Sequence, residues 1–284
     1  MSIAPRGLLD LDFSGIAVTL RGLAAADRER LAAEWSPFGA SEPTTPFLTL
    51  DVRYDGGAYD KPTFRPKRMQ SEFRGTTACF RMSEGSVEVD AGGTGRLSLL
   101  DSGGDRRYYT LQNMIRAGLA WCLPSRSAGM FHGAGLVVSG MGFLLVGPEG
   151  SGKSSWARIA GEAGVRVLSD DVVVIDGSNG RFEVLGTPFR STYRADYRPG
   201  RWPLAAVLFP VQGSPPEWRK APRLLSQARL IANLPFVAEG LESDGRIEAL
   251  VGRVAGEVPC GELTFGLDPS FLRLLAAWPP AGAR

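Results

Sequence analysis

The residues Gly147–Ser154 read Gly-Pro-Glu-Gly-Ser-Gly-Lys-Ser and satisfy the pattern G-x-x-x-x-G-K-[ST]. Glycines at this spacing let backbone N–H groups turn toward phosphate oxygens, and a helix that begins directly after them adds the positive end of its dipole. Lys153 can then bridge the β- and γ-phosphates of a nucleotide, while the Ser154 hydroxyl can bind Mg²⁺. The pattern therefore predicts a phosphate loop for ATP and Mg²⁺.

The flanking residues support this interpretation, because the apolar run Phe143–Val146 precedes the loop and residues 155–160 contain neither Gly nor Pro. Strand, loop and helix thus follow in the required order. The alternative is a glycine-rich turn with an exposed lysine, which this context disfavours. We expect the nucleotide to be bound by Gly147, Glu149, Gly150, Ser151, Gly152, Lys153, Ser154 and Ser155.

Two carboxylates, Asp170 and Asp171, interrupt an apolar strand pattern downstream of the loop. A buried charge without a partner is costly, so we expect the pair at a strand end, facing a metal ion or another cation. Adjacent strand residues point to opposite faces, which suggests different roles. One could accept the proton of an incoming hydroxyl, and the other could hold Mg²⁺ directly or through water. The alternative is an Asp-Asp turn at a sheet edge.

Two groups of basic residues lie outside the loop. The first follows the segment Gly186–Phe189, where a loop could fold over the nucleotide or the acceptor, and it comprises Arg190, Arg194, Arg198 and Arg201. Arginine suits this task because its planar fork binds phosphate oxygens in two places. We take Arg190 as the catalytic candidate, with ordinary surface arginines as the alternative. The second group, Lys61, Arg65, Lys67, Arg68 and Arg74, is interpreted as a solvated sheet face.

Composition limits the classes of function. Hydrophobic residues make up 44% of the 284 residues and charged residues 22%, which is typical of a soluble protein with a sizeable core. The formal charge of +2 provides no field to hold a nucleic acid or a membrane, so we expect neither as a partner. The three cysteines are far apart and indicate neither a zinc site nor a disulfide framework.

The first residues predict no targeting segment. Arg6, Asp10 and Asp12 interrupt any signal-peptide core, and no run approaches the ~18 apolar residues of a membrane span. We therefore expect a cytoplasmic protein.

Residues 1–125 are expected to form a smaller α+β domain with a mostly antiparallel sheet, which could recognise the acceptor or a partner. Short apolar runs between glycine-rich turns predict strands at 15–20, 46–52, 72–82, 86–90 and 96–100. Helical spacing predicts helices at 24–35 and 109–122, the second of which ends before Pro124.

Residues 126–284 are expected to form an α/β domain, because β-branched runs alternate there with helical stretches. The predicted strands are 134–139, 142–146, 165–168, 172–175, 182–185, 204–209 and 262–266. The predicted helices are 153–163, 221–233, part of 238–254, and 269–278.

The stretch His132–Ile175 resembles the catalytic domain of HPr serine kinase/phosphorylase and its HprK-like relatives. The likeness is carried by His132-Gly133 before the loop, by the loop itself, and by Ser169-Asp170-Asp171 after one helix and one strand. It implies a P-loop fold like that of ATP-dependent phosphoenolpyruvate carboxykinase and transfer of a phosphoryl group to a serine hydroxyl. It also implies that Asp170 acts as the base, that Asp171 lies beside the metal ion together with Ser154, and that His132 lines the phosphate site.

His132 is the only histidine in the chain. On residue type alone, a hydrogen-bonded core histidine is the more common interpretation. The position that it shares with the family adds a catalytic role as the second interpretation.

The sequence departs from true HPr kinases after the aspartate pair. The family's glycine-containing acidic segment, which supplies a further metal-ligand glutamate, has no clear counterpart. Instead, Gly186-Thr187-Pro188-Phe189 resembles HprK-related proteins found with peptide-modification genes, including kinases of lasso-peptide precursors. Residues 203–209 and 263–265 are similar to that branch as well. This resemblance favours a peptide acceptor other than HPr.

Three hypotheses follow. The first is a Mg-ATP-dependent serine kinase of a peptide or protein. The second is a kinase of a small-molecule hydroxyl, such as that of a free amino acid or sugar, which the catalytic residues do not separate from the first. The third is a non-catalytic nucleotide-binding regulatory protein, which has little use for both aspartates. The oligomeric state stays open, and a homo-oligomer is compatible with the sequence.

Overall fold

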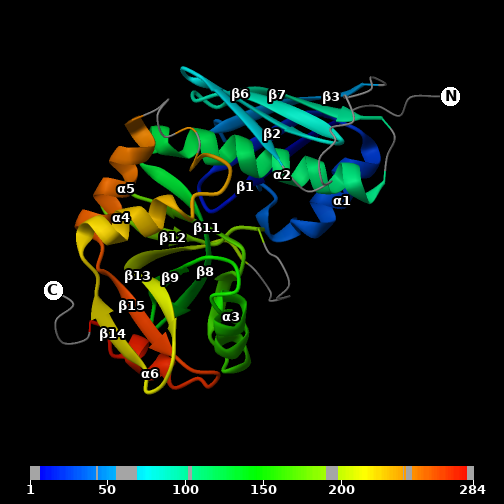
Figure 1. Cartoon of the computed structure of the whole chain (residues 1–284). Helices are drawn as coiled ribbons and strands as arrows, with labels where there is room; N and C mark the ends of the chain where they lie inside the picture. Colours follow the sequence, from blue (N-terminus) through cyan, green and yellow to red (C-terminus); the bar gives the residue numbers. More distant parts are fainter. Residues whose placement is uncertain are drawn as a thin grey trace. The chain divides into compact units, whose positions relative to one another are not determined.

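The computed structural model describes residues 7–42, 44–55, 69–101, 104–189, 198–238, 240 and 245–279. It is a mixed α/β structure with two sheets (Figure 1). The chain forms two compact units. The first comprises Met1–Ser125 and Glu239–Gly245, and the second comprises Arg126–Ala238 and Arg246–Arg284.

The first unit contains a seven-stranded sheet in the order β1-β2-β3-β7-β6-β5-β4. The pairs β2–β3 and β3–β7 are parallel and the other four are antiparallel. Its strands are β1 (Gly7–Asp12), β2 (Ala17–Leu23), β3 (Leu48–Asp55), β4 (Gln70–Arg74), β5 (Thr77–Met82), β6 (Gly85–Asp90) and β7 (Thr94–Leu100), and its helices are α1 (Ala25–Glu34) and α2 (Asp105–Cys122).

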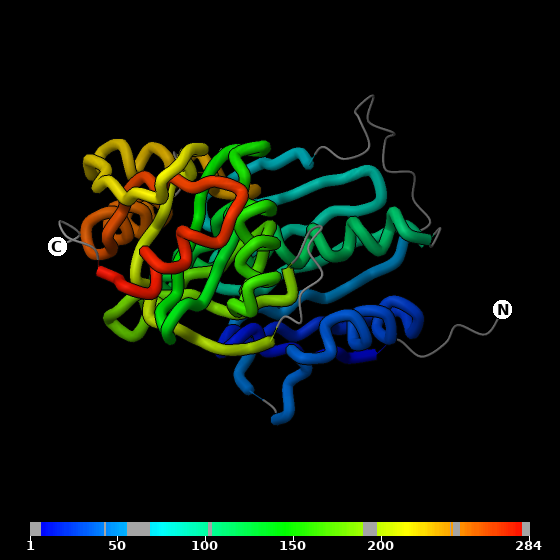
Figure 2. The backbone as a smooth tube through the Cα atoms, turned by 90° about the horizontal axis from the view of Figure 1, so that it is seen from below, coloured from blue at the N-terminus to red at the C-terminus, as the bar shows by residue number. Residues whose placement is uncertain are grey.

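Successive side chains of a strand point to opposite faces of this sheet, and α2 packs on the face that carries the apolar ones. Leu48, Leu50 and Val52 of β3 are buried, whereas the alternating residues Asp51 and Arg53 are exposed. The trace in Figure 2 shows α2 running along the strands, and its helically spaced apolar side chains are buried there. The first unit therefore has one covered sheet face with an apolar core.

The prediction of one strand over 72–82 is wrong, because the structure has two antiparallel strands, β4 and β5, in this region. Arg74 pairs with Thr77 across a tight turn in which Gly75 has a φ of 57°, a conformation that glycine adopts without steric cost. Strand β1 is a further element that the sequence patterns did not indicate. It is an edge strand that pairs with β2 and is mostly half-exposed, so its apolar alternation is weak.

The second unit begins with the long strand β8 (Ala128–Val138) and contains eight strands and four helices among its described residues. The other strands are β9 (Met141–Val146), β10 (Arg166–Ser169), β11 (Val172–Asp176), β12 (Glu183–Leu185), β13 (Arg201–Gln212), β14 (Glu217–Lys220) and β15 (Cys260–Phe265). The helices are α3 (Lys153–Glu162), α4 (Arg223–Ile231), α5 (Gly245–Glu257) and α6 (Phe271–Ala276).

Strand β8 pairs with three strands along its length, β11, β9 and β10. Residues 128–132 pair with β11, and residues 133–138 pair with β9. The short edge strand β14 was not predicted from the sequence, because three of its four residues are exposed and charged. The sheet thus places β9, the strand that leads into the phosphate loop, beside β8 and β13.

Parallel pairing determines where the phosphate loop lies. Strand β9 pairs parallel with β13, and β13 pairs parallel with β15, so the carboxyl ends of the three strands meet at one edge. A Cβ atom on Gly147 would lie 2.8 Å from Pro210 Cγ, and one on Gly152 would lie 3.3 Å from the Phe265 ring. The loop thus leaves β9 beside the ends of β13 and β15.

Helix α3 carries the loop's lysine and is held firmly. It packs against β8 and β10 (Figure 1), and its buried Trp156 stacks on Phe271 of α6 with ring centroids 5.7 Å apart. The first turn of α3 therefore has a fixed position relative to the sheet. In the described part of the chain, every helix is too short or too polar to cross a membrane.

Gly142 of β9 should tolerate no side chain. A Cβ atom there would lie 2.0 Å from Cγ1 of Val184, which is itself buried. We expect Gly142→Ala to lower the free energy of unfolding by about 1–3 kcal/mol, measured by urea denaturation. The control Gly245→Ala adds a methyl group at a helix start with nothing within 4 Å. Equal stability of the two variants would contradict the close packing at β9.

Candidate functional site

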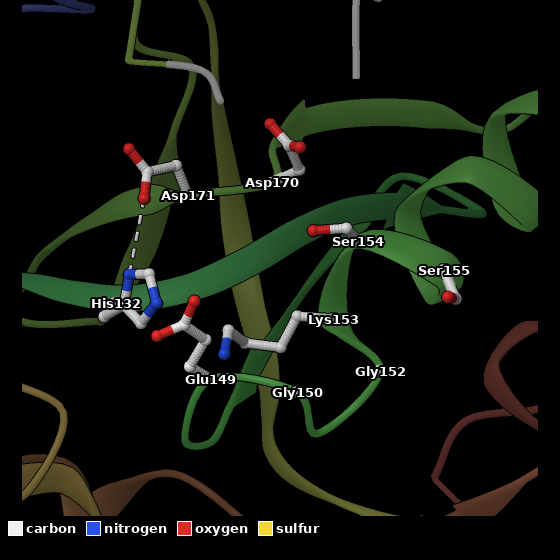
Figure 3. Close-up of a pocket in the computed structure, with 9 residues that line it drawn as sticks. All are labelled: His132, Glu149, Gly150, Gly152, Lys153, Ser154, Ser155, Asp170 and Asp171. Atoms are coloured by element: carbon white, nitrogen blue, oxygen red, sulfur yellow. Dashed lines mark ion pairs between the residues drawn. The ribbon is translucent and has the colours of Figure 1, made fainter. Parts of the chain in front are cut away.

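A cavity of about 550 Å³ lies beside the loop after β9 (Figure 3). This volume falls within the range of small-molecule sites. Its lining comes from β8, the loop, the start of α3 and the turn between β10 and β11, and it consists of His132, Glu149, Gly150, Gly152, Lys153, Ser154, Ser155, Asp170 and Asp171. Segments that are separated in sequence thus converge on one cavity.

The backbone of the loop turns by means of two glycines. Gly150 has a φ of 79° and Gly152 has a φ of 99°, both in the left-handed region. Gly152 is also the N-cap of α3, and the first N–H groups of a helix have no acceptors within the helix. These N–H groups and the helix dipole make the loop suitable for an anion such as phosphate.

Lys153 is buried, and its Nζ atom donates to the carbonyl oxygens of Gly147 at 2.6 Å and Pro148 at 2.7 Å. An ammonium group has three donors, so these two bonds leave one for a phosphate oxygen. Burial lowers the pKa of Lys153, although the charges of Asp171 and Glu149 act in the opposite direction. The lysine is thus already oriented at the loop.

The two aspartates occupy the turn between the end of β10 at Ser169 and the start of β11 at Val172. The Oγ atom of Ser169 accepts the N–H groups of Asp171 and Val172, each at 3.3 Å, and donates to the carbonyl oxygen of Phe189. Figure 3 shows Asp170 and Asp171 on the side of the cavity opposite the loop. Both aspartates therefore line the same cavity as the loop.

His132 lies at the cavity and not in the core, since 39% of its side chain is exposed. Its Nδ1 atom lies 3.4 Å from Oδ1 of Asp171 (Figure 3). The backbone also links the two segments, because the N–H of Gly133 donates to the carbonyl of Asp171 at 3.0 Å. His132 and Asp171 thus form a pair on one wall of the cavity.

The loop also contains a serine hydroxyl, that of Ser151, and the cavity contains possible metal ligands. The Oγ atom of Ser151 is buried and has no hydrogen-bond partner within the described structure. A buried hydroxyl without a partner is unfavourable, but Ser151, like Gly147, is not among the residues that line the cavity. Within the described ranges, no three His, Cys, Asp or Glu side chains are grouped to hold a metal ion by themselves. A Mg²⁺ ion held mainly by phosphates needs only one or two protein carboxylates, so Ser154 and Asp171 suit it.

The structure describes only some of the candidate arginines. Arg190 and Arg194 lie outside the described residues, so the proposed catalytic role of Arg190 stays a prediction. Arg201 does not line the cavity; it forms ion pairs with Asp176 at 3.0 Å and Glu183 at 2.7 Å. Arg201 therefore links β11, β12 and β13, and the expectation that it folds over a nucleotide is not supported.

Sequence reasoning assigned no role in the site to three residues that contribute to it. Ser169 and Phe189 brace the aspartate turn, and the carbonyl of Asn233 accepts the N–H of His132 at 2.7 Å. A serine directly before an Asp-Asp pair is a recognisable turn signal, because its hydroxyl can accept nearby N–H groups. The contacts of Phe189 and Asn233 depend on the fold and had no local signal.

The chain matches no protein-family model, and no curated protein matches it. Among solved structures, the Hpr(Ser) kinase/phosphatase from Coxiella burnetii is similar to it, with 12% sequence identity and a TM-score of 0.27. The similarity covers 51% of this chain and 90% of that one. At such a low TM-score the likeness carries no argument about function.

Ser169 should be important for the stability of the aspartate turn. Ser169→Ala leaves a buried carbonyl and two N–H groups without their partner, so we expect a loss of about 1–3 kcal/mol in the free energy of unfolding. Urea denaturation measures this loss. The control Ser178→Ala removes an exposed hydroxyl, which contacts Arg126 at 3.3 Å and also bonds to Asp176, and it should change stability by less than about 0.5 kcal/mol. An equally small effect for Ser169→Ala would show that the turn does not depend on this hydroxyl.

Proposed function

We propose that this chain is a Mg-ATP-dependent kinase that transfers the γ-phosphoryl group to the serine hydroxyl of a peptide or protein. The observation that carries this proposal is the placement of Asp170 and Asp171 across one cavity from the phosphate loop. The loop by itself supports only nucleotide binding. Carboxylates opposite the phosphates add a group that can receive a proton from an acceptor.

The donor nucleotide is held by the loop. The glycines at positive φ and the start of α3 bind phosphate oxygens, and Lys153 contributes a further donor from its buried position. When Mg²⁺ is bound at Ser154 and Asp171, it neutralises charge on the β- and γ-phosphate oxygens.

The acceptor hydroxyl approaches from the side of the aspartate turn. Its oxygen forms a bond to the γ-phosphorus while the bond from that phosphorus to the bridging oxygen of ADP breaks. The hydroxyl proton passes to Asp170, which is buried at the cavity wall. His132 orients the Asp171 carboxylate through the 3.4 Å pair, so the two aspartates perform separate tasks.

The choice of a peptide acceptor rests on the segment after β12. Gly186–Phe189 resembles the HprK-related branch found with peptide-modification genes. The carbonyl oxygen of Phe189 accepts a hydrogen bond from the hydroxyl of Ser169, which lies beside the aspartate pair. Gly186 itself packs tightly, since a Cβ atom there would lie 2.2 Å from the carbonyl oxygen of Arg198. This segment is therefore connected to the site that performs the transfer, which supports a role in acceptor choice.

Lys153→Ala should weaken ATP binding by at least about tenfold, because it removes a charged donor to the phosphates. Isothermal titration calorimetry with Mg-ATP measures the dissociation constant. Arg158→Ala is a suitable control, because Arg158 lies on the exposed face of the same helix and pairs with Glu162. Unchanged affinity in Lys153→Ala would remove the loop from nucleotide binding.

Asp170→Asn should keep ATP binding within about threefold of the original while turnover falls by about a hundredfold or more, because the amide does not accept the hydroxyl proton. Steady-state release of ADP measures turnover. If Asp170→Asn turns over at the original rate, Asp170 is not the base.

The acceptor is identified by incubating the protein with Mg-ATP and serine-containing peptides, proteins, free serine and sugars. Mass spectrometry then locates the added phosphate. We expect phosphoserine within a peptide or protein chain. Phosphate found only on a free metabolite would contradict the peptide acceptor, and ATP binding without any transfer would contradict kinase activity.

A further inference from the structure

We propose that Glu149 makes the phosphate site discriminate against nucleotide without a bound metal ion, so that the metal-bound triphosphate is the form selected. This inference rests on the proposed function, because it assumes that a nucleoside triphosphate is bound at the loop. It assigns Glu149 a role in specificity rather than in the transfer step.

Glu149 lies within the loop, between the turn at Pro148 and the left-handed Gly150. It lines the cavity, and Figure 3 shows its carboxylate directed toward the side that holds His132 and the Nζ atom of Lys153. Its charge acts on Lys153, since it raises the lysine pKa against the effect of burial. A carboxylate therefore faces the space where phosphates bind.

The charges around the cavity are unusual for a polyanion site. Among the described residues, three acidic side chains, Glu149, Asp170 and Asp171, line it together with a single lysine. That lysine already donates to two loop carbonyls. Neutral N–H groups and the helix dipole favour phosphate, but they offset only part of the repulsion from three carboxylates.

A metal-free triphosphate brings about four negative charges into this field, whereas a divalent cation removes half of them. Asp170 is the group proposed to accept the proton, and Asp171 is the group proposed to hold the metal ion. Glu149 is on the loop itself, close to the phosphates and apart from the aspartate turn. The charge of Glu149 therefore weakens the binding of metal-free nucleotide more than the binding of metal-bound nucleotide.

The test measures the dissociation constant of ATP by calorimetry, once with excess Mg²⁺ and once with EDTA, for the original chain and for Glu149→Gln. We expect the original chain to bind ATP at least about tenfold more tightly with Mg²⁺. In Glu149→Gln, the ratio of the dissociation constant in EDTA to that with Mg²⁺ should fall roughly fivefold, because ATP should bind more tightly in EDTA. The matched control Glu162→Gln removes an exposed carboxylate on α3 outside the cavity and should leave the ratio unchanged.

Each outcome bears on one of the two proposals. A ratio that does not narrow in Glu149→Gln, or metal-free binding that stays undetectable there, overturns the role of Glu149 and leaves the kinase proposal intact. Narrowing that comes only from weaker Mg-ATP binding also overturns it, because repulsion would then not be the cause. Absence of ATP binding to the original chain with Mg²⁺ overturns the proposed function itself.

Discussion

Parallel pairing of β9 with β13, and of β13 with β15, is the constraint on which the candidate site depends. It brings three strand ends to one edge, and the loop after Val146 leaves the sheet at that edge against Pro210 and Phe265. Helix α3 must then begin where its dipole points into the cavity. The stack of Trp156 on Phe271 holds the helix in this direction.

The opposite wall of the cavity depends on β8. Because its first half pairs with β11 and its second half with β9, His132 lies between the segment that carries the aspartates and the strand that leads into the loop. Hydrogen bonds of Ser169 then set the direction of the aspartate turn. A rigid sheet thus places groups from distant parts of the sequence within one cavity, which phosphoryl transfer requires since it depends mainly on positioning.

Charge is the second organising feature of the site. A cavity lined by three acidic side chains and one lysine is poorly suited to a bare polyphosphate, although its backbone is suited to phosphate. A divalent cation would neutralise part of the phosphate charge, so that the phosphates could bind the loop's backbone beside the acidic side chains. The acidic lining that we propose selects metal-bound nucleotide also contains the group proposed to accept the proton, so nucleotide selection and transfer would share one set of charges.

Local patterns in the sequence were sufficient for most elements near the loop. Continuous apolar runs predicted β9 and β11, and the absence of Gly and Pro predicted α3 with its start at Lys153, because these signals depend on neighbouring residues. The phosphate loop was visible for the same reason. Edge elements such as β1 and β14 were missed, and β4 and β5 were merged, since exposed strands carry weak patterns and a single Gly75 marked the turn.

By itself the sequence determined the chemistry available to this protein: a phosphate loop, two adjacent carboxylates and one histidine. Only the tertiary structure decided that His132 lies beside Asp171, that Phe189 braces the aspartate turn, and that Arg201 belongs to an ion-pair network away from the cavity. These contacts join residues far apart along the chain. Strand order and register create them, and no local spacing encodes either one.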